Sequence, residues 1–512
     1  MDDQLTFLFM DYETFNSNPK GGRVSQYASI RTNYALEIQK DSAKNYFCLQ
    51  SKDNIPSPSA ALITKLTPQK IERIKNGIEP LPASTFNVIP EVYNEYWFIS
   101  HIEYDMSLPK TCTLGYNSFK FDDEFTRNLL YRNLRDPYER EWSNNNSRFD
   151  VYFLVLATYV LKPEILNFPQ ARDKENNELL YHSKTNLPLP SFRLEDLSIA
   201  NKISHTNAHD AFSDVEATIE IMKIIKNADE YFFEEIFSLR KKKNVNDWLN
   251  KNNNKPFIHI SQYYGKENYS MGILYQIANN HRAYLCLNLS HDVQPLIDLE
   301  GEDLENYLFP KETFEYKKNV VIIYNNQCPI LANVSEYAER LKSFNLDREK
   351  MSKNLNLIRE NINPLSAKLK PLYFKDFPLS TDKIDSDLKI YSGGFFSDLE
   401  RDSISQFHCA ITMNNNSFSI QNMASPRLKE MALKIIARNF PDKLTEEEKK
   451  WWFNYSRNRI SNKEIGSEYT IDDCTNEISE LFKKQLKIDE MFILAELREY
   501  VNSLKRYYQL TS

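Results

Sequence analysis

The sequence has few cysteines, no long apolar run and no basic leader, and each absence excludes a class of protein. Its six cysteines lie far apart without a Cys-x-x-Cys pair, which argues against a zinc knuckle or a redox pair. No stretch of about 18 apolar residues is present, so nothing is expected to span a membrane. Acidic Asp2 and Asp3 stand where a signal peptide would carry basic residues. We therefore expect a soluble, cytoplasmic protein, with Cys112 and Cys286 buried as reduced thiols because they lie in apolar runs.

The charge balance excludes a generally cationic nucleic-acid-binding protein. The chain has 64 lysines and arginines against 71 aspartates and glutamates, a net charge of −7. A polyanion would therefore have to bind in a local basic groove on an acidic body. The 512 residues are enough for about two to four domains with sizeable cores.

Hydrophobic patterning divides the chain into three regions. Residues 1 to about 225 alternate strand-like and helix-like segments, which is typical of an α/β domain. Residues 256 to about 324 are mostly strand-like, and from about residue 335 the period is helical. In the first region Thr67 and Pro68 are expected to start a helix. Expected strands there include residues 5–10, 34–38, 46–49 and 111–115, and residues 240–243 and 250–254 are expected to form a boundary or an exposed turn.

The first apolar run ends in two carboxylates, Asp11 and Glu13. Residues two apart in a strand project to the same side, here roughly 7 Å apart along the backbone. Two like charges held in this way repel each other, so a divalent cation such as magnesium or manganese is a natural occupant between them. The alternative is a solvated strand end with two surface acids.

Three further residues can complete such a site from distant segments. Asp122 lies at the start of an expected helix, and His209 and Asp214 lie at the start of another. Several carboxylates can hold two metal ions that clamp the attacking and leaving oxygens of a phosphodiester. A histidine at that position could take a proton from water. Taken singly, Asp122 also fits a charged first helical turn, and the His209–Asp214 spacing also fits a surface pair.

The order and spacing of these residues resemble a known family. Asp11-x-Glu13, Asn117-x-x-x-Phe121-Asp122 and His209-x-x-x-x-Asp214 are similar to the histidine-bearing branch of the DEDD 3′→5′ exonucleases. Within it the chain resembles the bacterial exonuclease I family over nearly its whole length. The segments that carry this closer resemblance are residues 7–15, 114–117, 121–124, 126–128, 136–138, 191–195, 207–211, 326–329, 394–398 and 437–441.

The resemblance implies a fold and an activity. It implies an α/β exonuclease domain with a ribonuclease-H-like mixed sheet and flanking helices at residues 1–229, an SH3-like β-barrel at 230–358 and a helical domain at 362–512. The implied activity is processive, magnesium-dependent 3′→5′ hydrolysis of single-stranded DNA that releases 5′-mononucleotides, in DNA repair and recombination. The implied partner is the acidic tail of single-stranded DNA-binding protein, and the enzyme is expected to act as a monomer in the bacterial cytosol or nucleoid, with no membrane partner.

The resemblance also assigns site residues. By that matching the catalytic carboxylates Asp11, Glu13, Asp122 and Asp214 would hold two Mg²⁺ ions, with Mn²⁺ as an acceptable substitute, and His209 would be the general base. Glu13 and Arg193 would contact the substrate, since a guanidinium can bind phosphate through two hydrogen bonds. The alternative for Arg193 is an ion pair with Glu195 or Asp196 next to it in the sequence.

Basic and aromatic residues interleave between positions 119 and 148, as in grooves that grip single strands. We expect the strand contacts to include Phe15, Phe119, Arg127, Tyr138, Trp142, Arg240 and Lys242. Tyr263 and Tyr264 are weaker candidates. The alternative is a solvated face of mixed charge, because acids are interspersed through the same segment.

Two other functions fit the same residues. One is an RNA 3′-end-trimming enzyme of the same superfamily, although such enzymes are much shorter chains. The other is a non-catalytic scaffold that binds single-stranded DNA, although all five catalytic positions carry suitable residues. Polar residues 173–184 and the Asn-rich residues 414–422 depart from the family pattern and could alter how a groove closes.

Overall fold

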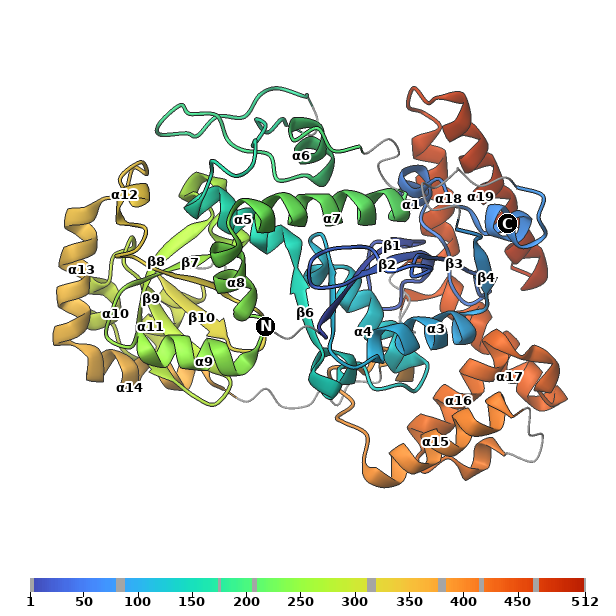
Figure 1. The fold of residues 1–512 in the computed structure, drawn as a ribbon. Helices are drawn as coiled ribbons and strands as arrows, with labels where there is room; N and C mark the ends of the chain where they lie inside the picture. The colour runs from blue at the N-terminus through green and yellow to red at the C-terminus, as the bar shows by residue number, and fades with distance from the viewer. Residues whose placement is uncertain are drawn as a thin grey trace. The chain divides into compact units, whose positions relative to one another are not determined.

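The computed structural model describes residues 4–79, 88–173, 176–204, 210–310, 319–375, 384–413, 419–463 and 469–510. It consists of two compact units (Figure 1). Unit 1 comprises Met1–Ser147, Thr206–Glu216 and Pro378–Ser512, and unit 2 comprises Arg148–His205 and Ala217–Phe377. Strand β6 (Ser147–Asp150) and helix α7 (Ala211–Ala228) run across the boundaries between them.

Unit 1 is built on a mixed sheet, as the sequence predicts for the first region. Within this unit the strand order is β4-β3-β2-β1-β5. Strand β1 pairs antiparallel with β2 and parallel with β5, so it occupies an interior position. The strands are β1 (Thr6–Thr14), β2 (Val24–Thr32), β3 (Lys44–Cys48), β4 (Glu91–Tyr93) and β5 (Thr111–Gly115).

The two sides of β1 have different neighbours because its side chains alternate. Leu8, Met10 and Tyr12 point into a core formed with helices α3 (Glu95–Ser107) and α4 (Asp122–Arg132). The Tyr12 hydroxyl accepts a hydrogen bond from Thr126 in this core at 3.1 Å, so Tyr12 packs on the side of the strand opposite Asp11 and Glu13. The opposite side carries the alternate residues, including Asp11 and Glu13.

The remaining helices of unit 1 come from both ends of the chain. Helix α2 packs with Phe15 and Phe47 in a second small core, and α15 and α16 form a third core with residues of α3 and α4. The helices are α1 (Pro58–Thr64), α2 (Pro68–Lys75), α15 (Asp398–Thr412), α16 (Pro426–Asn439), α17 (Glu446–Ser461), α18 (Ile471–Leu481) and α19 (Ile488–Tyr507).

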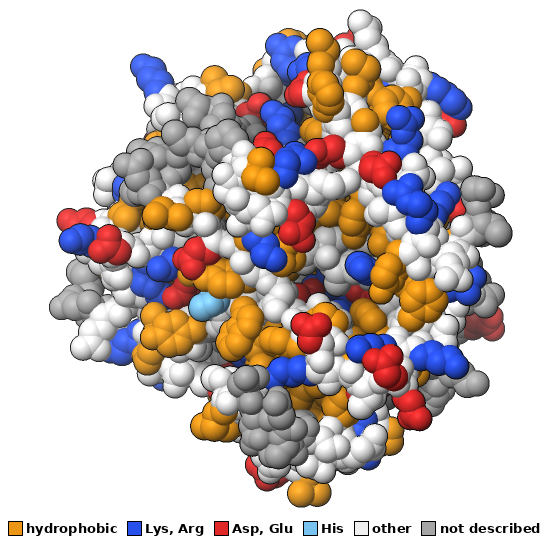
Figure 2. All heavy atoms as spheres, turned by 90° about the vertical axis from the view of Figure 1, so that its right-hand side faces the viewer, with side chains coloured by type: hydrophobic (Ala, Val, Ile, Leu, Met, Phe, Trp, Pro, Cys, Tyr) orange, Lys and Arg blue, Asp and Glu red, His pale blue; other side chains and the backbone are white. Residues whose placement is uncertain are grey.

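A buried cluster of charges joins the N-terminal part of unit 1 to its C-terminal helices. Asp53 contacts Arg23 at 3.3 Å, Arg438 at 2.7 Å and Arg459 at 3.8 Å. Each of these four side chains is at most 3% exposed. The surface is different: on the face of the molecule in Figure 2, basic and acidic side chains are interspersed.

Unit 2 contains a five-stranded antiparallel sheet with the order β10-β9-β8-β7-β11. This confirms the prediction that residues 256 to about 324 are rich in strands. Its strands are β7 (Phe257–Ile260), β8 (Met271–Asn279), β9 (Ala283–Asn288), β10 (Val320–Tyr324) and β11 (Ile330–Asn333). Its helices are α5 (Val151–Leu161), α6 (Leu194–Ala200), α8 (Glu230–Ser238), α9 (Lys242–Lys251), α10 (Gln294–Asp298), α11 (Gly301–Leu308), α12 (Ala338–Leu341), α13 (Arg348–Glu360) and α14 (Ile362–Tyr373).

One local prediction was wrong and a second holds only in part. Residues 34–38 form a turn rather than a strand, with Leu36 in the left-handed region at φ 64°. Residues 240–241 and 252–254 form turns as expected, but residues 242–243 and 250–251 belong to helix α9 (Lys242–Lys251), because Val245 and Leu249 lie on one helical face and are buried. Residues 414–418 of the Asn-rich segment lie outside the described residues.

Two other features agree with the sequence. Cys112 and Cys286 are buried and form no disulfide bond. None of the helices in the described ranges is both long and apolar enough to cross a lipid bilayer.

Candidate metal centre

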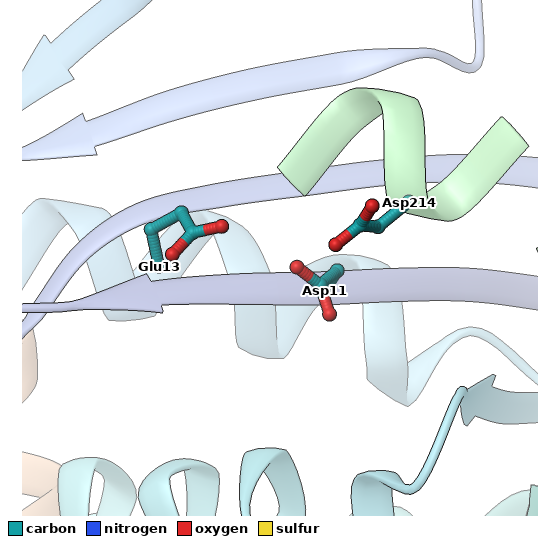
Figure 3. Close-up of side chains that lie close together, drawn as sticks. All are labelled: Asp11, Glu13 and Asp214. Carbon is teal, nitrogen blue, oxygen red and sulfur yellow. The ribbon is translucent and has the colours of Figure 1, made fainter. Parts of the chain in front are cut away.

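Three carboxylates from two elements of unit 1 come together as the sequence predicts. Asp11 and Glu13 project from β1, and Asp214 reaches toward them from the first turn of α7 (Figure 3). One oxygen of each carboxylate lies within 4.8 Å of an oxygen of both others. Glu13 is buried, and Asp11 and Asp214 are half-buried.

Asp122, the fourth predicted carboxylate, lies at the start of α4 and contacts the backbone of the same strand. Its Oδ1 accepts a hydrogen bond from the Tyr12 backbone N–H at 3.1 Å. This bond ties α4 to β1 between Asp11 and Glu13. The charge of Asp122 also acts on both of these residues and raises their pKa.

The electrostatics of the cluster favour a cation. Burial raises the pKa of Asp11 well above its usual value, and the charges of Asp122, Asp214 and Glu13 raise it further. Burial likewise raises the pKa of Glu13, again with neighbouring acids adding to the effect. Among the residues that the structure describes, no lysine or arginine forms an ion pair with Asp11 or Glu13. Clustered carboxylates that repel one another are suited to hard divalent cations, so the donor set fits magnesium or manganese.

A fifth acid, Asp210, was not among the predicted site residues. Its charge raises the pKa of both Asp11 and Glu13, and burial raises its own pKa. Its carboxylate accepts a hydrogen bond from Gln26 Nε2 of β2 at 3.4 Å. The spacing to Asp214 is the available sequence signal, because residues four apart share one face of a helix.

His209 lies outside the described residues, together with residues 205–208. Arg193 belongs to unit 2, where it stands just before α6 and forms an ion pair with Glu195 at 2.8 Å. Its side chain is 61% exposed. The ion pair with Glu195 is the alternative given above for Arg193. A phosphate contact by Arg193 stays a prediction.

The side chains expected to contact DNA in unit 1 differ in their exposure to solvent. Trp142 is 68% exposed, and Tyr138 and Phe119 are half-buried. Phe15 is 2% exposed within the core beside α2, so its ring offers no open face to a base in this conformation. Arg127 is bound by Glu124 at 2.6 Å and by Glu141 at 2.8 Å, which is the charge neutralisation given above as the alternative.

The expected contacts in unit 2 lie around α9. The Arg240 guanidinium stacks 3.6 Å from the centre of the Phe237 ring, and Lys242 is exposed. Tyr263 is 43% exposed. Tyr264 is buried and its hydroxyl bonds His259 Nδ1 at 2.8 Å, so Tyr264 has no open face for a base.

Relatives of known activity match almost the entire chain. An exodeoxyribonuclease I from Escherichia coli (strain K12) is 33% identical over 466 residues, which cover 89% of this chain and 90% of the relative. Another from Buchnera aphidicola subsp. Schizaphis graminum is 33% identical over 457 residues, 88% of this chain and 87% of the relative. The chain belongs to the exodeoxyribonuclease I family. It is therefore an exonuclease.

Domain families and solved structures extend this exodeoxyribonuclease I assignment. The family described as Exonuclease I SH3-like domain matches residues 240–375, and the one described as Exonuclease I C-terminal domain matches residues 384–504. E. coli exonuclease I in complex with a dA16 oligonucleotide superimposes with a TM-score of 0.83 at 29% identity, covering 98% of this chain and 100% of the other. The zinc-bound form of the E. coli ExoI–ssDNA complex gives 0.82 at 30% identity, covering 98% and 99%. An ExoI/SSB-Ct complex gives 0.80 at 28% identity, also covering 98% and 99%.

Proposed function

We propose that this protein is a divalent-metal-dependent exonuclease that degrades single-stranded DNA from its 3′ end and releases 5′-mononucleotides. The observation that carries the proposal is the buried cluster of Asp11, Glu13 and Asp214 on a chain of the exodeoxyribonuclease I family. The oligonucleotide complexes of the E. coli relative support single-stranded DNA as the substrate.

We assign the cation site to Asp11, Glu13, Asp122 and Asp214, and Mg²⁺ is the proposed physiological ion. Two bound divalent ions would supply charge stabilisation at the attacking and leaving oxygens of the phosphodiester. The protein's own part is to hold the carboxylates on a rigid strand and a helix start, where mutual repulsion keeps them ready for cations. His209 is the proposed general base, and Glu13 and Arg193 the proposed substrate contacts.

The proposed DNA path follows the aromatic and basic residues that are open to solvent. Trp142, Tyr138 and Phe119 are the stacking candidates of unit 1. Arg240 and Lys242 are the phosphate contacts proposed for unit 2. Arg127 can contact DNA only if phosphates replace its ion pairs with Glu124 and Glu141. Phe15 can contact DNA only if the small core around it opens.

The proposed domain boundaries remain residues 1–229, 230–358 and 362–512. The matched families begin at residues 240 and 384 and support three parts in this order. The ExoI/SSB-Ct complex supports the acidic tail of a single-stranded DNA-binding protein as a partner. We place the activity in the bacterial cytosol, where that partner and chromosomal DNA are found, and propose a monomer.

One assay tests this function. End-labelled single-stranded DNA and RNA of the same sequence are incubated with the protein, with Mg²⁺ or with EDTA, and the products are resolved by length. We expect stepwise shortening of the DNA from its 3′ end in Mg²⁺ alone. Faster shortening of the RNA would favour the end-trimming alternative, and cutting of a circular single strand would contradict an exonuclease.

A further inference from the structure

Gln26 connects the strand beside β1 to the residue from which α7 starts. It lies on β2, is 5% exposed, and is the direct cross-strand partner of Glu13. Its amide nitrogen donates to Asp210 Oδ1 at 3.4 Å and to Asn45 Oδ1 of β3 at 3.0 Å. An amide nitrogen has two hydrogens, so these two bonds use both and fix the direction in which the side chain points.

Asp210 carries this connection into helix α7. Its carboxylate accepts a hydrogen bond from the Phe212 backbone N–H, in the manner of an N-cap. Its carbonyl accepts from the Asp214 N–H at 3.1 Å, which closes the first helical turn. Asp210 and Asp214 therefore form one hydrogen-bonded unit. The tether that holds Asp210 to β2 also sets where Asp214 stands above β1.

We propose that Gln26 is a positioning residue of the nuclease site. Through Asp210 it holds the first turn of α7 on the sheet, so that the Asp214 carboxylate lies beside Asp11 and Glu13. This inference rests on the proposed function, because it takes Asp214 as a metal ligand. The Asp210 carboxylate has the Gln26 amide and the Phe212 N–H as donors.

Replacement of the amide by an apolar group of similar size tests the tether. Gln26→Met is compared with Gln50→Met, since Gln50 Nε2 also donates twice, to the Asn54 carbonyl and to Asn54 Oδ1, both at 2.9 Å. Mutation of a residue that orients a metal ligand typically lowers metal affinity by about 10–100-fold. We expect Gln26→Met to weaken Mn²⁺ binding, measured by calorimetry without DNA, by about that factor, and Gln50→Met to leave it unchanged. In turnover assays at fixed Mg²⁺, kcat should fall while KM for single-stranded DNA stays constant.

Two variants of Asp210 separate the tether from its charge. Asp210→Asn keeps an oxygen that can accept from Gln26, so Mn²⁺ affinity should stay within about threefold of the wild type. Asp210→Ala removes that oxygen and should reproduce Gln26→Met, and the double variant Gln26→Met/Asp210→Ala should be no weaker than either single one.

The possible failures are distinguishable. Unchanged Mn²⁺ affinity in Gln26→Met would overturn the positioning role, and so would an Asp210→Asn variant that binds as weakly as Asp210→Ala, because the charge would then act directly. An equal loss in Gln50→Met would also overturn it, because the effect would then be general destabilisation. The proposed function fails on a different result, namely normal metal-dependent cleavage by Asp214→Ala.

Discussion

At the scale of single residues, the clustered carboxylates are placed by two kinds of local structure. Asp11 and Glu13 are two apart on β1, so the alternation of a strand puts both on the side away from α3 and α4. Asp214 stands in the first turn of α7, where the partial positive charge of the helix end favours a carboxylate. The strand thus holds Asp11 and Glu13 rigidly, and the helix places Asp214 next to them.

The Asp214→Ala variant tests the metal assignment. It removes one of three carboxylates that lie within 4.8 Å of one another, so cation binding should be lost while the DNA-binding surface stays intact. Cleavage in Mg²⁺ should fall by more than the ~10–100-fold typical of residues that only orient ligands. Single-stranded DNA affinity, measured in EDTA by fluorescence anisotropy, should change little. Turnover near the wild-type rate would show that Asp214 holds no essential ion.

The His209→Ala variant tests the proposed general base. A general base usually contributes ~10²–10⁴-fold to the rate, so kcat should fall within that range. The slope of the rate against pH below neutrality should also flatten, because the titrating imidazole is gone. His209→Gln serves as the control for side-chain volume. An unchanged rate would reduce the residue to a structural role.

The site could be predicted from the sequence as far as its residues follow from local geometry. The strand alternation of Asp11 and Glu13 is visible in the sequence, and Asp214 follows from its helix start. Asp210 was missed because its place depends on Gln26, a residue on another strand with no motif of its own. The pairing of Arg127 with Glu141, 14 positions away, depends in the same way on how the chain folds back.

At the scale of elements, helix α2 shows how a short local signal becomes a tertiary contact. Thr67 is the N-cap that the sequence predicts: its hydroxyl accepts from the Lys70 N–H at 3.1 Å, with Pro68 as the first helical residue. The same hydroxyl donates to Glu496 Oε2 of α19 at 2.6 Å. The cap therefore also anchors the C-terminal helix.

Thr67→Val should lower the free energy of unfolding by about 1–2 kcal/mol, since it removes the cap of the Lys70 N–H and the hydrogen bond to the half-buried Glu496 carboxylate. Thr67 is fully buried, and valine preserves its shape. Thr67→Ser keeps the hydroxyl and should cost less than about 1 kcal/mol. Urea unfolding of the three proteins provides the comparison. Equal losses in both variants would show that packing, rather than the hydroxyl, matters at this position.

Most elements with a strong hydrophobic period were predicted, and the failures have physical causes. Helices α16, α17 and α19 follow the helical period of residues 428–438, 446–455 and 489–507. Strand β2 was missed because it is buried on both faces yet contains polar residues, so no alternation is visible. Arg31, for example, is satisfied by the hydroxyls of Thr6 and Thr111 at 2.7 and 2.8 Å. Such partners cannot be deduced from β2 alone.

At the scale of the whole molecule, the buried ionic cluster holds together parts of unit 1 that are far apart in the sequence. Arg438 bridges Asp53 and Asp387, and Arg132 binds Glu95 through two hydrogen bonds of 3.0 and 2.8 Å. No sequence pattern predicts these pairs, because hundreds of residues separate some of the partners.

Asp53→Asn should destabilise the protein by about 3–5 kcal/mol, the usual effect of removing one partner of a buried ion pair. Arg23, Arg438 and Arg459 would keep their charges but lose the one carboxylate that all three share. Glu480→Gln is the surface control, because its pair with Lys483 is more than 60% exposed on both sides and should contribute at most about 1 kcal/mol. Denaturant unfolding gives both values. A loss below 1 kcal/mol in Asp53→Asn would show that the cluster adds little to stability.

Glu95 makes this cluster sensitive to acid. Burial alone would raise its pKa, but the charges of Arg132 and Arg23 outweigh burial and lower the pKa from 4.5 to about 2. A lowered pKa in the folded state gives stability that is complete above pH 4.5 and is lost as the pH falls toward 2. The wild type should lose about 3 kcal/mol over that interval relative to Glu95→Gln, measured by urea unfolding at a series of pH values. A constant difference between the two proteins would contradict this.

The same cluster has a consequence for biosynthesis. Asp53 is made early, whereas Arg438, which binds it at 2.7 Å, lies 385 residues later in the chain. At ribosomal speeds of about 5–20 residues per second, roughly 20–80 s pass before that arginine leaves the ribosome. During this time Asp53 has Arg23 as a partner but still lacks Arg438. The final packing of the N-terminal sheet is therefore a late event of biosynthesis, although its strands are among the first to be synthesised.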